Sequence, residues 1–211
     1  QNRDSAHSEE LVVPNSRVMA AHGAQLSAVQ VTAFAVTYLA YTILYFARKP
    51  LSVVKADVLK DSTLSLDSVA LGHLDTSFLV SYTLGQFILP RYTHLLRTRY
   101  LLCLGLVLAA LCTAAFGYSA SAALMTVAWG LNGFVQSCMY SLSVKALTPI
   151  FPAGAGRGKM MGLWTTCQQA GAVLSSAFAA FVAKRYGWRA AFELPSLIVF
   201  GAACMVFAGL P

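Results

Sequence analysis

The fold is decided by residues 100–118, which read YLLCLGLVLAALCTAAFGY and contain no charged side chain. A helix that crosses a bilayer needs about 20 mostly apolar residues, and this stretch has that length and composition. Only the short segment Ser119–Ser121 separates it from a second long apolar stretch, residues 122–147. The two stretches therefore predict a hairpin of two membrane-spanning helices.

The composition of the whole chain agrees with a membrane protein. Of its 211 residues, 57% are hydrophobic and 11% are charged, and the mean hydropathy is +0.63. A water-soluble domain usually has about 45–50% apolar and about 25% charged residues, so an ordinary soluble core is excluded. The net charge is +7, and the basic residues lie between or just inside the apolar stretches. This distribution favours contact with membrane lipid or an anionic solute over nucleic acid.

Four further apolar stretches bring the number of predicted spans to six, at residues 28–45, 71–89, 160–183 and 190–210. Each stretch is far too long for a membrane β-strand of about 9–11 residues. We therefore expect an all-α, multi-pass integral membrane protein. Its predicted organisation is a polar N-terminal tail, residues 1–27, and a transmembrane domain of six helices, residues 28–211.

The sequence contains no pattern of an enzyme site. It has no glycine-rich phosphate loop, no zinc-protease motif and no Ser–His–Asp order. Its five cysteines all lie in apolar stretches without CxxC spacing, which is typical of small buried side chains rather than metal ligands or disulfides. We expect no enzymatic activity, no metal and no cofactor.

Polar side chains inside the first predicted span form one helical face. Tyr38, Tyr41, Tyr45 and Arg48 follow one another at spacings of 3, 4 and 3. One interpretation is an aromatic belt at the membrane interface, with Arg48 and Lys49 reaching toward water. The other is a tyrosine-lined wall that leads to a guanidinium. Because the rigid fork of donors of a guanidinium matches phosphate oxygens, the ligand in this interpretation would be a phosphorylated anion.

The second span offers a possible charge pair. Asp75 lies near the start of this span, with Tyr82 and Gln86 further along it. Asp75 is either a surface acid at a helix N-terminus, where the helix dipole favours it, or an intramembrane partner of Lys49 or Arg48.

The fourth and fifth spans also carry polar groups in register. Gln136 and Tyr140 share one face of the fourth span with Asn132, and Trp164 and Gln168 are neighbours on the fifth. Hydrogen bonds between helices would explain these groups, and so would a water-filled path.

Several motifs together resemble one transporter family. They are RKPLSVVK at 48–55, LGHLDTSFL at 71–79, SYTLGQF at 81–87, NGFVQ at 132–136, RG at 157–158 and GLW at 162–164. Over roughly residues 30–200 the chain resembles the sugar-phosphate exchangers, which belong to the organophosphate:phosphate antiporters of the major facilitator superfamily. The resemblance is compatible with the plasma membrane and with an endomembrane such as the endoplasmic reticulum.

The resemblance implies a twelve-helix fold of two six-helix halves, of which this chain is the N-terminal half. It implies an antiporter that exchanges an organophosphate, such as a sugar phosphate or glycerol 3-phosphate, for inorganic phosphate by alternating access. Arg48 matches the phosphate-binding arginine of the family. The matching cavity residues are Tyr41, Tyr45, Tyr82, Gln136 and Trp164.

The chain departs from the family pattern at several positions. Gln86, Gln168 and Tyr140 stand where the glycerol-3-phosphate transporter has a cavity lysine, a histidine and a tryptophan. Pro90 and His94 occupy the Gly and Asp places of the loop motif after the second span, so conformational gating is expected to differ.

The chain begins with Gln1 and ends at Pro211, where the last apolar stretch finishes. We expect it to be part of a longer polypeptide whose C-terminal six-helix half supplies a second arginine; pairing with a second subunit is the other arrangement. The alternative functions are a non-transporting scaffold or receptor, a diverged half-transporter, and a major facilitator carrier of another small solute.

Overall fold

The part of the chain that the structure describes consists of helices joined by short connections. The computed structural model describes residues 27–64, 66–151 and 154–210, and these ranges contain helices and no β-strand. The predicted tail lies outside the described residues, except for Ser27, which caps the first helix through its hydroxyl. The prediction of an all-α chain is confirmed.

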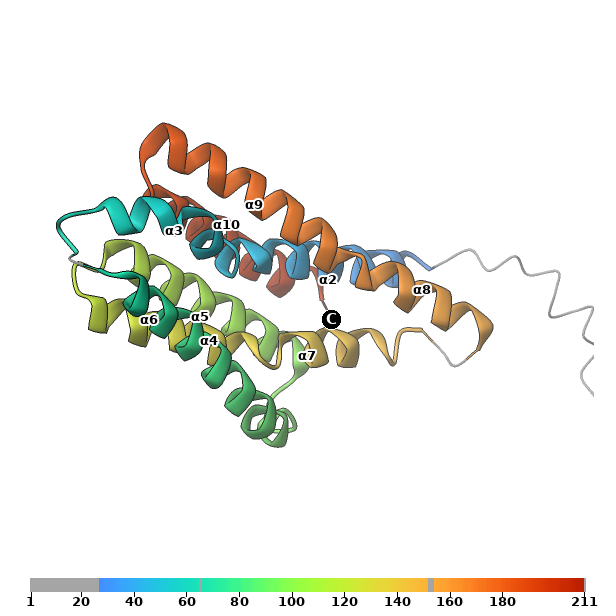
Figure 1. Cartoon of the computed structure of the whole chain (residues 1–211). Helices are drawn as coiled ribbons and strands as arrows, with labels where there is room; N and C mark the ends of the chain where they lie inside the picture. Colours follow the sequence, from blue (N-terminus) through green and yellow to red (C-terminus); the bar gives the residue numbers. More distant parts are fainter. Residues whose placement is uncertain (1–26, 65, 152–153, 211) are drawn as a thin grey trace, which may run out of the picture.

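Each predicted span corresponds to a helical segment, and the segments lie side by side in an elongated bundle (Figure 1). Three are single helices, α4 (Ser68–Ile88), α5 (Thr98–Tyr118) and α10 (Ala190–Gly209). The others are divided: α2 (Ala28–Leu44), η1 (Tyr45–Ala47) and α3 (Pro50–Lys60); α6 (Ala122–Gln136) and α7 (Met139–Leu147); α8 (Ala155–Thr165) and α9 (Cys167–Tyr186). A short turn, η2 (Leu89–Tyr92), follows α4.

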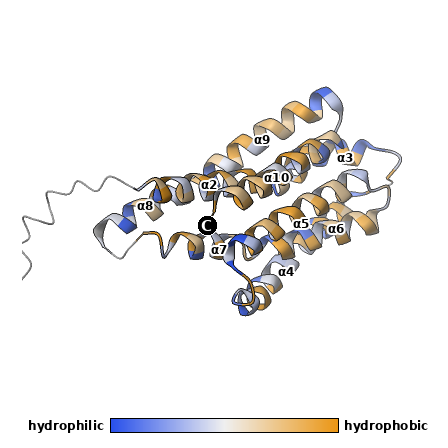
Figure 2. Ribbon diagram, turned by 180° about the vertical axis from the view of Figure 1, so that it is seen from behind, coloured by the Kyte–Doolittle hydropathy of each residue, from blue (hydrophilic) through white to orange (hydrophobic). Residues whose placement is uncertain are grey.

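The outer surface of the bundle is apolar. Among the described residues, three segments are long and apolar enough to cross a membrane by length and composition: residues 28–60, α5 and α10. Figure 2 shows hydrophobic residues along the helices and hydrophilic residues gathered mainly near their ends and connections. Large apolar side chains such as Phe87, Leu111 and Phe181 are exposed. An extended apolar surface of this kind is suited to contact with lipid.

The first segment is longer than predicted. Residues 50–60, which lie beyond the predicted first span of residues 28–45, form helix α3. Pro50 is tolerated because it occupies the first turn, where its missing N–H has no helical partner to lose. Leu51, Val54 and Val58 then fall on one face and are buried, whereas the charged residues between them obscured this pattern in the sequence.

Glycines allow the helices to approach closely. A Cβ atom added to Gly85 of α4 would lie 2.8 Å from the Phe134 carbonyl oxygen of α6, and one added to Gly133 of α6 would lie 2.5 Å from the Phe78 oxygen. Small residues at such positions are a common means of packing membrane helices, because they let backbones meet. The same device brings α9 to α2 at Gly171.

A cluster of polar contacts, here called the loop latch, joins three connections at one end of the bundle. Trp188 Nε1 donates to Asp61 Oδ2 at 3.0 Å, and Arg189 Nη2 lies 3.8 Å from the same oxygen. Arg189 Nη1 also donates to the carbonyl oxygens of Gly117 and Ser119 at 2.9 and 2.8 Å. Hydrogen bonds from Thr63, and then from Trp188, hold the pKa of the Asp61 carboxyl below its usual value. The latch therefore ties the α3–α4, α5–α6 and α9–α10 connections together.

Candidate functional site

The site is organised around Arg48, which follows the 3-10 turn η1 between α2 and α3. Arg48 Nε donates to Gln136 Oε1 at 3.0 Å. The Gln136 amide in turn donates to Asn132 Oδ1 at 2.7 Å, and Asn132 Nδ2 donates to the Ala47 carbonyl oxygen at 2.7 Å. Both amide side chains are fully buried. They bind a carbonyl at the helix break and hold the arginine in place. Of the two explanations that the sequence allowed for the polar face of Asn132 and Gln136, hydrogen bonding between helices is therefore the one observed.

The guanidinium of Arg48 lies among aromatic rings and keeps a free donor. Its central carbon is 5.3 Å from the Tyr45 ring centroid, 5.1 Å from that of Tyr82 and 6.0 Å from that of Phe78. Its Nη2 atom is buried and has no hydrogen-bond partner among the described residues. Buried donors are nearly always satisfied, so such a group points to a ligand with acceptor oxygens.

The three divided segments each carry residues of this site near their divisions. The first breaks at η1, beside Arg48. The fourth breaks after Gln136, and the fifth breaks at Thr166, between Trp164 and Gln168. Hydrogen bonds join the first segment to the fifth, since Tyr38 OH lies 3.0 Å from Thr166 Oγ1 and Tyr45 OH donates to Gln168 Oε1 at 3.3 Å. Discontinuous helices are typical of solute sites in secondary transporters.

Two of the predicted cavity residues are packed inside the bundle. Trp164 is fully buried and donates from Nε1 to Thr37 Oγ1 at 3.1 Å. Its ring lies 5.5 Å from that of Tyr41 and 5.6 Å from that of Tyr140, measured between centroids. Tyr41 is also buried, and its ring lies 6.0 Å from that of Tyr45. Tyr41, Tyr140 and Trp164 therefore form an aromatic support behind Tyr45.

Gln86 stands apart from this cluster. It is exposed on α4, one turn beyond Tyr82, and no hydrogen bond joins it to the other site residues in the described part of the chain. Tyr82 itself stacks on Phe78 at 6.1 Å. The structure therefore brings Arg48, Tyr45, Tyr82, Gln136 and Gln168 together and leaves Gln86 at the edge.

A cavity of about 250 Å³ opens beside Arg48, lined by Arg48, Lys49, Ser52, Asp75, Phe78, Leu79 and Trp129. Of the two interpretations of Asp75, the pairing with Lys49 or Arg48 is wrong, because Asp75 Oδ2 accepts a hydrogen bond from Lys55 Nζ. The reason is helix α3, which carries Lys55 onto the side facing α4. The sequence did not point to Lys55 because this residue lies outside the predicted spans, between residues 45 and 71.

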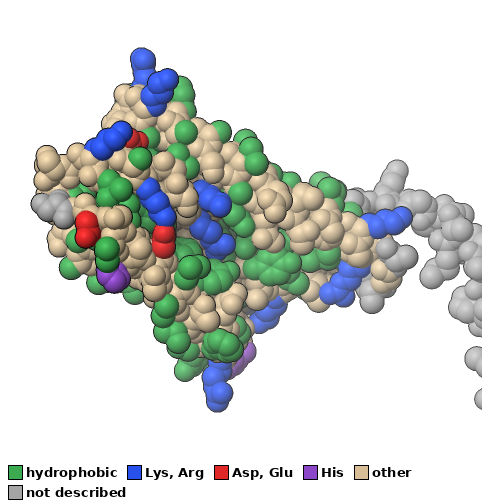
Figure 3. Space-filling model, in the orientation of Figure 1, with side chains coloured by type: hydrophobic (Ala, Val, Ile, Leu, Met, Phe, Trp, Pro, Cys, Tyr) green, Lys and Arg blue, Asp and Glu red, His purple; other side chains and the backbone are tan. Residues whose placement is uncertain are grey.

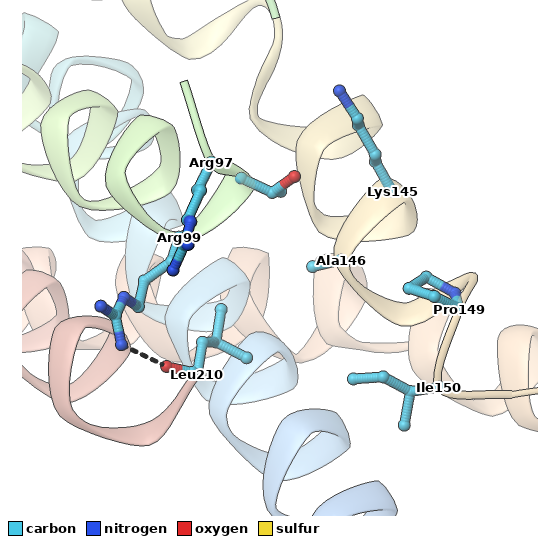
Figure 4. A pocket seen from close by; sticks show the side chains of 8 residues that line it. Arg97, Arg99, Lys145, Ala146, Pro149, Ile150 and Leu210 are labelled. Carbon is cyan, nitrogen blue, oxygen red and sulfur yellow. Dashed lines mark hydrogen bonds between the residues drawn. The ribbon is translucent and has the colours of Figure 1, made fainter. Parts of the chain in front are cut away.

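A second basic pocket lies at the end of the bundle opposite the loop latch. Figure 4 shows Arg97, Arg99 and Lys145 around it, and its volume is about 330 Å³. Arg99 Nη1 donates to the Leu210 carbonyl oxygen at 3.0 Å, and its guanidinium carbon lies 4.9 Å from the Tyr100 ring centroid. Arg99 thus contacts the end of α10 and the adjoining tyrosine.

Comparison with known proteins identifies relatives with named functions. A "Probable hexose phosphate transport protein" of Chlamydia pneumoniae is 27% identical over 164 residues, which cover 78% of this chain and 35% of that protein. The "Membrane sensor protein UhpC" of Salmonella typhimurium is 27% identical, with coverages of 80% and 38%. "Sugar phosphate exchanger 3" of Homo sapiens is 29% identical, with coverages of 88% and 43%.

The chain spans about two fifths of the length of these relatives. Its helices, divided spans and apolar surface agree with a multi-pass membrane protein. Residues 31–211 match the family described as Major Facilitator Superfamily, which is most of the chain. The chain therefore belongs to the major facilitator superfamily and has the all-α fold expected of its N-terminal half.

Proposed function

We propose that the polypeptide containing this chain exchanges an organophosphate for inorganic phosphate across a membrane by alternating access. The observation that carries the proposal is the guanidinium of Arg48 beside a cavity. Gln136 fixes it, and its buried Nη2 donor has no partner among the described residues. Phosphate oxygens are the acceptors that an arginine fork binds best. The names of two relatives, hexose phosphate transport protein and sugar phosphate exchanger, favour the same class of solute.

In this proposal, Arg48 and the residues around it have different roles. Arg48 binds the phosphoryl group, while Tyr45, Tyr82 and Gln168 form the adjoining wall. Gln136 positions the guanidinium through the hydrogen bond to its Nε. Tyr41, Tyr140 and Trp164 support the wall from behind. A C-terminal six-helix half would close the other side of the cavity and rock against this half around the bound anion.

Exchange follows from the charge of the empty site. A guanidinium inside a closed membrane protein is costly without a counter-charge, so closing around an empty cavity is unfavourable. A bound phosphate neutralises Arg48 and lowers that cost. The loaded protein can therefore change its orientation, whereas the empty protein cannot, and each outward movement of one anion is coupled to the inward movement of another.

The test is phosphate counterflow in liposomes that contain the full-length polypeptide. We expect rapid exchange of internal for external phosphate by the unaltered protein and at least a tenfold loss in Arg48→Ala, which removes the charge-assisted hydrogen bonds. Arg185→Ala is the matched control, because Arg185 is exposed at the end of α9. Undiminished exchange in Arg48→Ala would overturn the role assigned to this residue.

A second candidate function is phosphate-ester sensing without transport, and it rests on the relative named as a membrane sensor protein. Such a protein would bind hexose phosphate with Arg48 and show no counterflow. Binding and counterflow measured on one preparation separate the two functions. Competition by unphosphorylated sugar, and none by phosphate, would instead indicate a carrier of another solute.

A further inference from the structure

An ion pair between α3 and α4 lies at the rim of the Arg48 cavity. Asp75 lines the cavity directly, and Lys55 Nζ donates to its Oδ2 atom. Arg48, Ser52 and Lys55 follow at spacings of four and three, so Lys55 continues the helical side that Arg48 and Ser52 present to the cavity. Figure 3 shows lysine and arginine side chains close to an acidic one on the face of the molecule that includes α3 and α4.

Holding the fold together does not explain this pair. The Lys55 and Asp75 side chains are 38% and 43% exposed, and ion pairs this exposed contribute little to stability. Helix α3 is already packed on its neighbours through Leu51 and Val54, which are buried with Leu74 in one apolar cluster. The pair therefore calls for an explanation in the site rather than in the core.

The charges around the cavity match one kind of ligand. Arg48, Lys49 and Lys55 contribute three positive charges and Asp75 one negative charge, which leaves two positive charges. A phosphate monoester carries about −1.5 to −2 at pH 7. Asp75 alone at the rim would repel such an anion. With Lys55 beside it, the carboxylate is compensated, and the ammonium, which has three donors, can contact phosphate while it remains bonded to Asp75.

We propose that the Lys55–Asp75 pair sets the net charge of the phosphate site and so determines how tightly it holds a phosphorylated anion. This inference rests on the proposed function. Lys55 raises the affinity for the anion, and Asp75 lowers it enough for release. Both residues are specificity-determining, because together they match the net charge at the cavity to a dianion. Removal of Lys55 makes that net charge less positive, and removal of Asp75 makes it more positive.

The test uses three variants of the full-length polypeptide in proteoliposomes, at low ionic strength so that salt does not screen the effect. Asp75→Asn should lower the half-saturating concentration of inorganic phosphate by about threefold to tenfold and slow the maximal exchange rate. Lys55→Gln should raise that concentration by a similar factor. The double variant, which again has two positive charges, should return to within about twofold of the unaltered protein.

Matched controls make the same types of substitution, Asp to Asn and Lys to Gln, at positions of α3 that do not line the cavity. Asp57→Asn and Lys60→Gln alter exposed residues of this helix and should leave the half-saturating concentration unchanged. The rescue in the double variant is a readout that a structural role of the pair would not produce.

The inference is overturned if both single variants shift the phosphate affinity in the same direction, or if the double variant is as impaired as Lys55→Gln. In either case the proposed function stands, provided that the unaltered protein exchanges phosphate and Arg48→Ala does not. Absence of exchange and of phosphate binding in the unaltered protein overturns the proposed function itself.

Discussion

At the scale of single residues, the contact between Arg48 and Gln136 explains how one cation is kept ready inside an apolar bundle. Gln136 accepts from Nε, and Asn132 and Gln136 together bind the carbonyl of Ala47 at the helix break. The Nη2 donor has no hydrogen-bond partner in the part of the chain that the structure describes. A neutral amide is well suited to this task, since it orients the guanidinium without neutralising it.

Replacing that amide by a carboxylate should disable the site. In Gln136→Glu the new acid pairs with Arg48 and competes with phosphate, so exchange at neutral pH should fall at least tenfold. Because a protonated acid no longer competes, acidification should restore part of the activity. The measurement is phosphate counterflow against pH, with Gln169→Glu, an exposed position of α9, as the control. A rate equal to that of the unaltered protein at neutral pH contradicts the positioning role.

The site residues could be found from the sequence more readily than their arrangement. Polar groups in apolar stretches marked Arg48, Gln136 and Trp164, and the family resemblance gave them expected roles. The sequence did not indicate that Trp164 would be buried behind Tyr41, or that Gln136 would bond to the arginine 88 residues away. Spacing reports which side chains share a face of one helix, and the rotation of that helix against its neighbours is set by packing across the whole bundle.

At the scale of helices, the glycines of α4 and α6 decide how closely the two helices meet. Gly85→Ala should destabilise the protein by about 1–3 kcal/mol, since its Cβ would press on the backbone at Phe134. Gly72→Ala on the same helix meets no atom within 4 Å and should be neutral or stabilising by up to about 1 kcal/mol. Thermal unfolding in detergent compares the two, and equal effects would contradict the packing argument.

The six spans could be predicted from the length of the apolar stretches, whereas the divisions within three of these spans could not. The break at η1 and the helix α3 were missed because charged residues at 55, 57 and 60 interrupt an otherwise amphipathic pattern. The breaks after Gln136 and at Thr166 have no proline to mark them. They are determined by contacts between segments, such as the hydrogen bond between Tyr38 and Thr166, which a single sequence does not reveal.

At the scale of the whole molecule, the loop latch joins three connections at one end of the bundle, and we expect its contribution to stability to depend on pH. The pKa of Asp61 is lowered in the folded protein by its hydrogen bonds with Thr63 and Trp188. A lowered folded pKa contributes stability above the unfolded pKa, about 3.9, and that contribution is lost as the pH falls through the folded value.

Unfolding midpoints measured between neutral pH and about pH 3 should therefore fall more steeply for the unaltered protein than for Asp61→Asn, which lacks the titrating group. Asp57→Asn, which removes the same charge from an exposed position of α3, should keep the full pH dependence of the latch. Parallel curves for the unaltered protein and Asp61→Asn would exclude a contribution of the latch to stability.

Trp129 gives the cavity an optical reporter. It lines the space beside Arg48 and Asp75, while Trp164 lies in the aromatic support and Trp188 in the loop latch. These three are all the tryptophans of the chain. Replacing Trp164 and Trp188 by phenylalanine would leave an indole whose emission colour and quenching respond to an anion arriving at the guanidinium. The occupancy of the site could then be followed in real time by tryptophan fluorescence, without labelled solute.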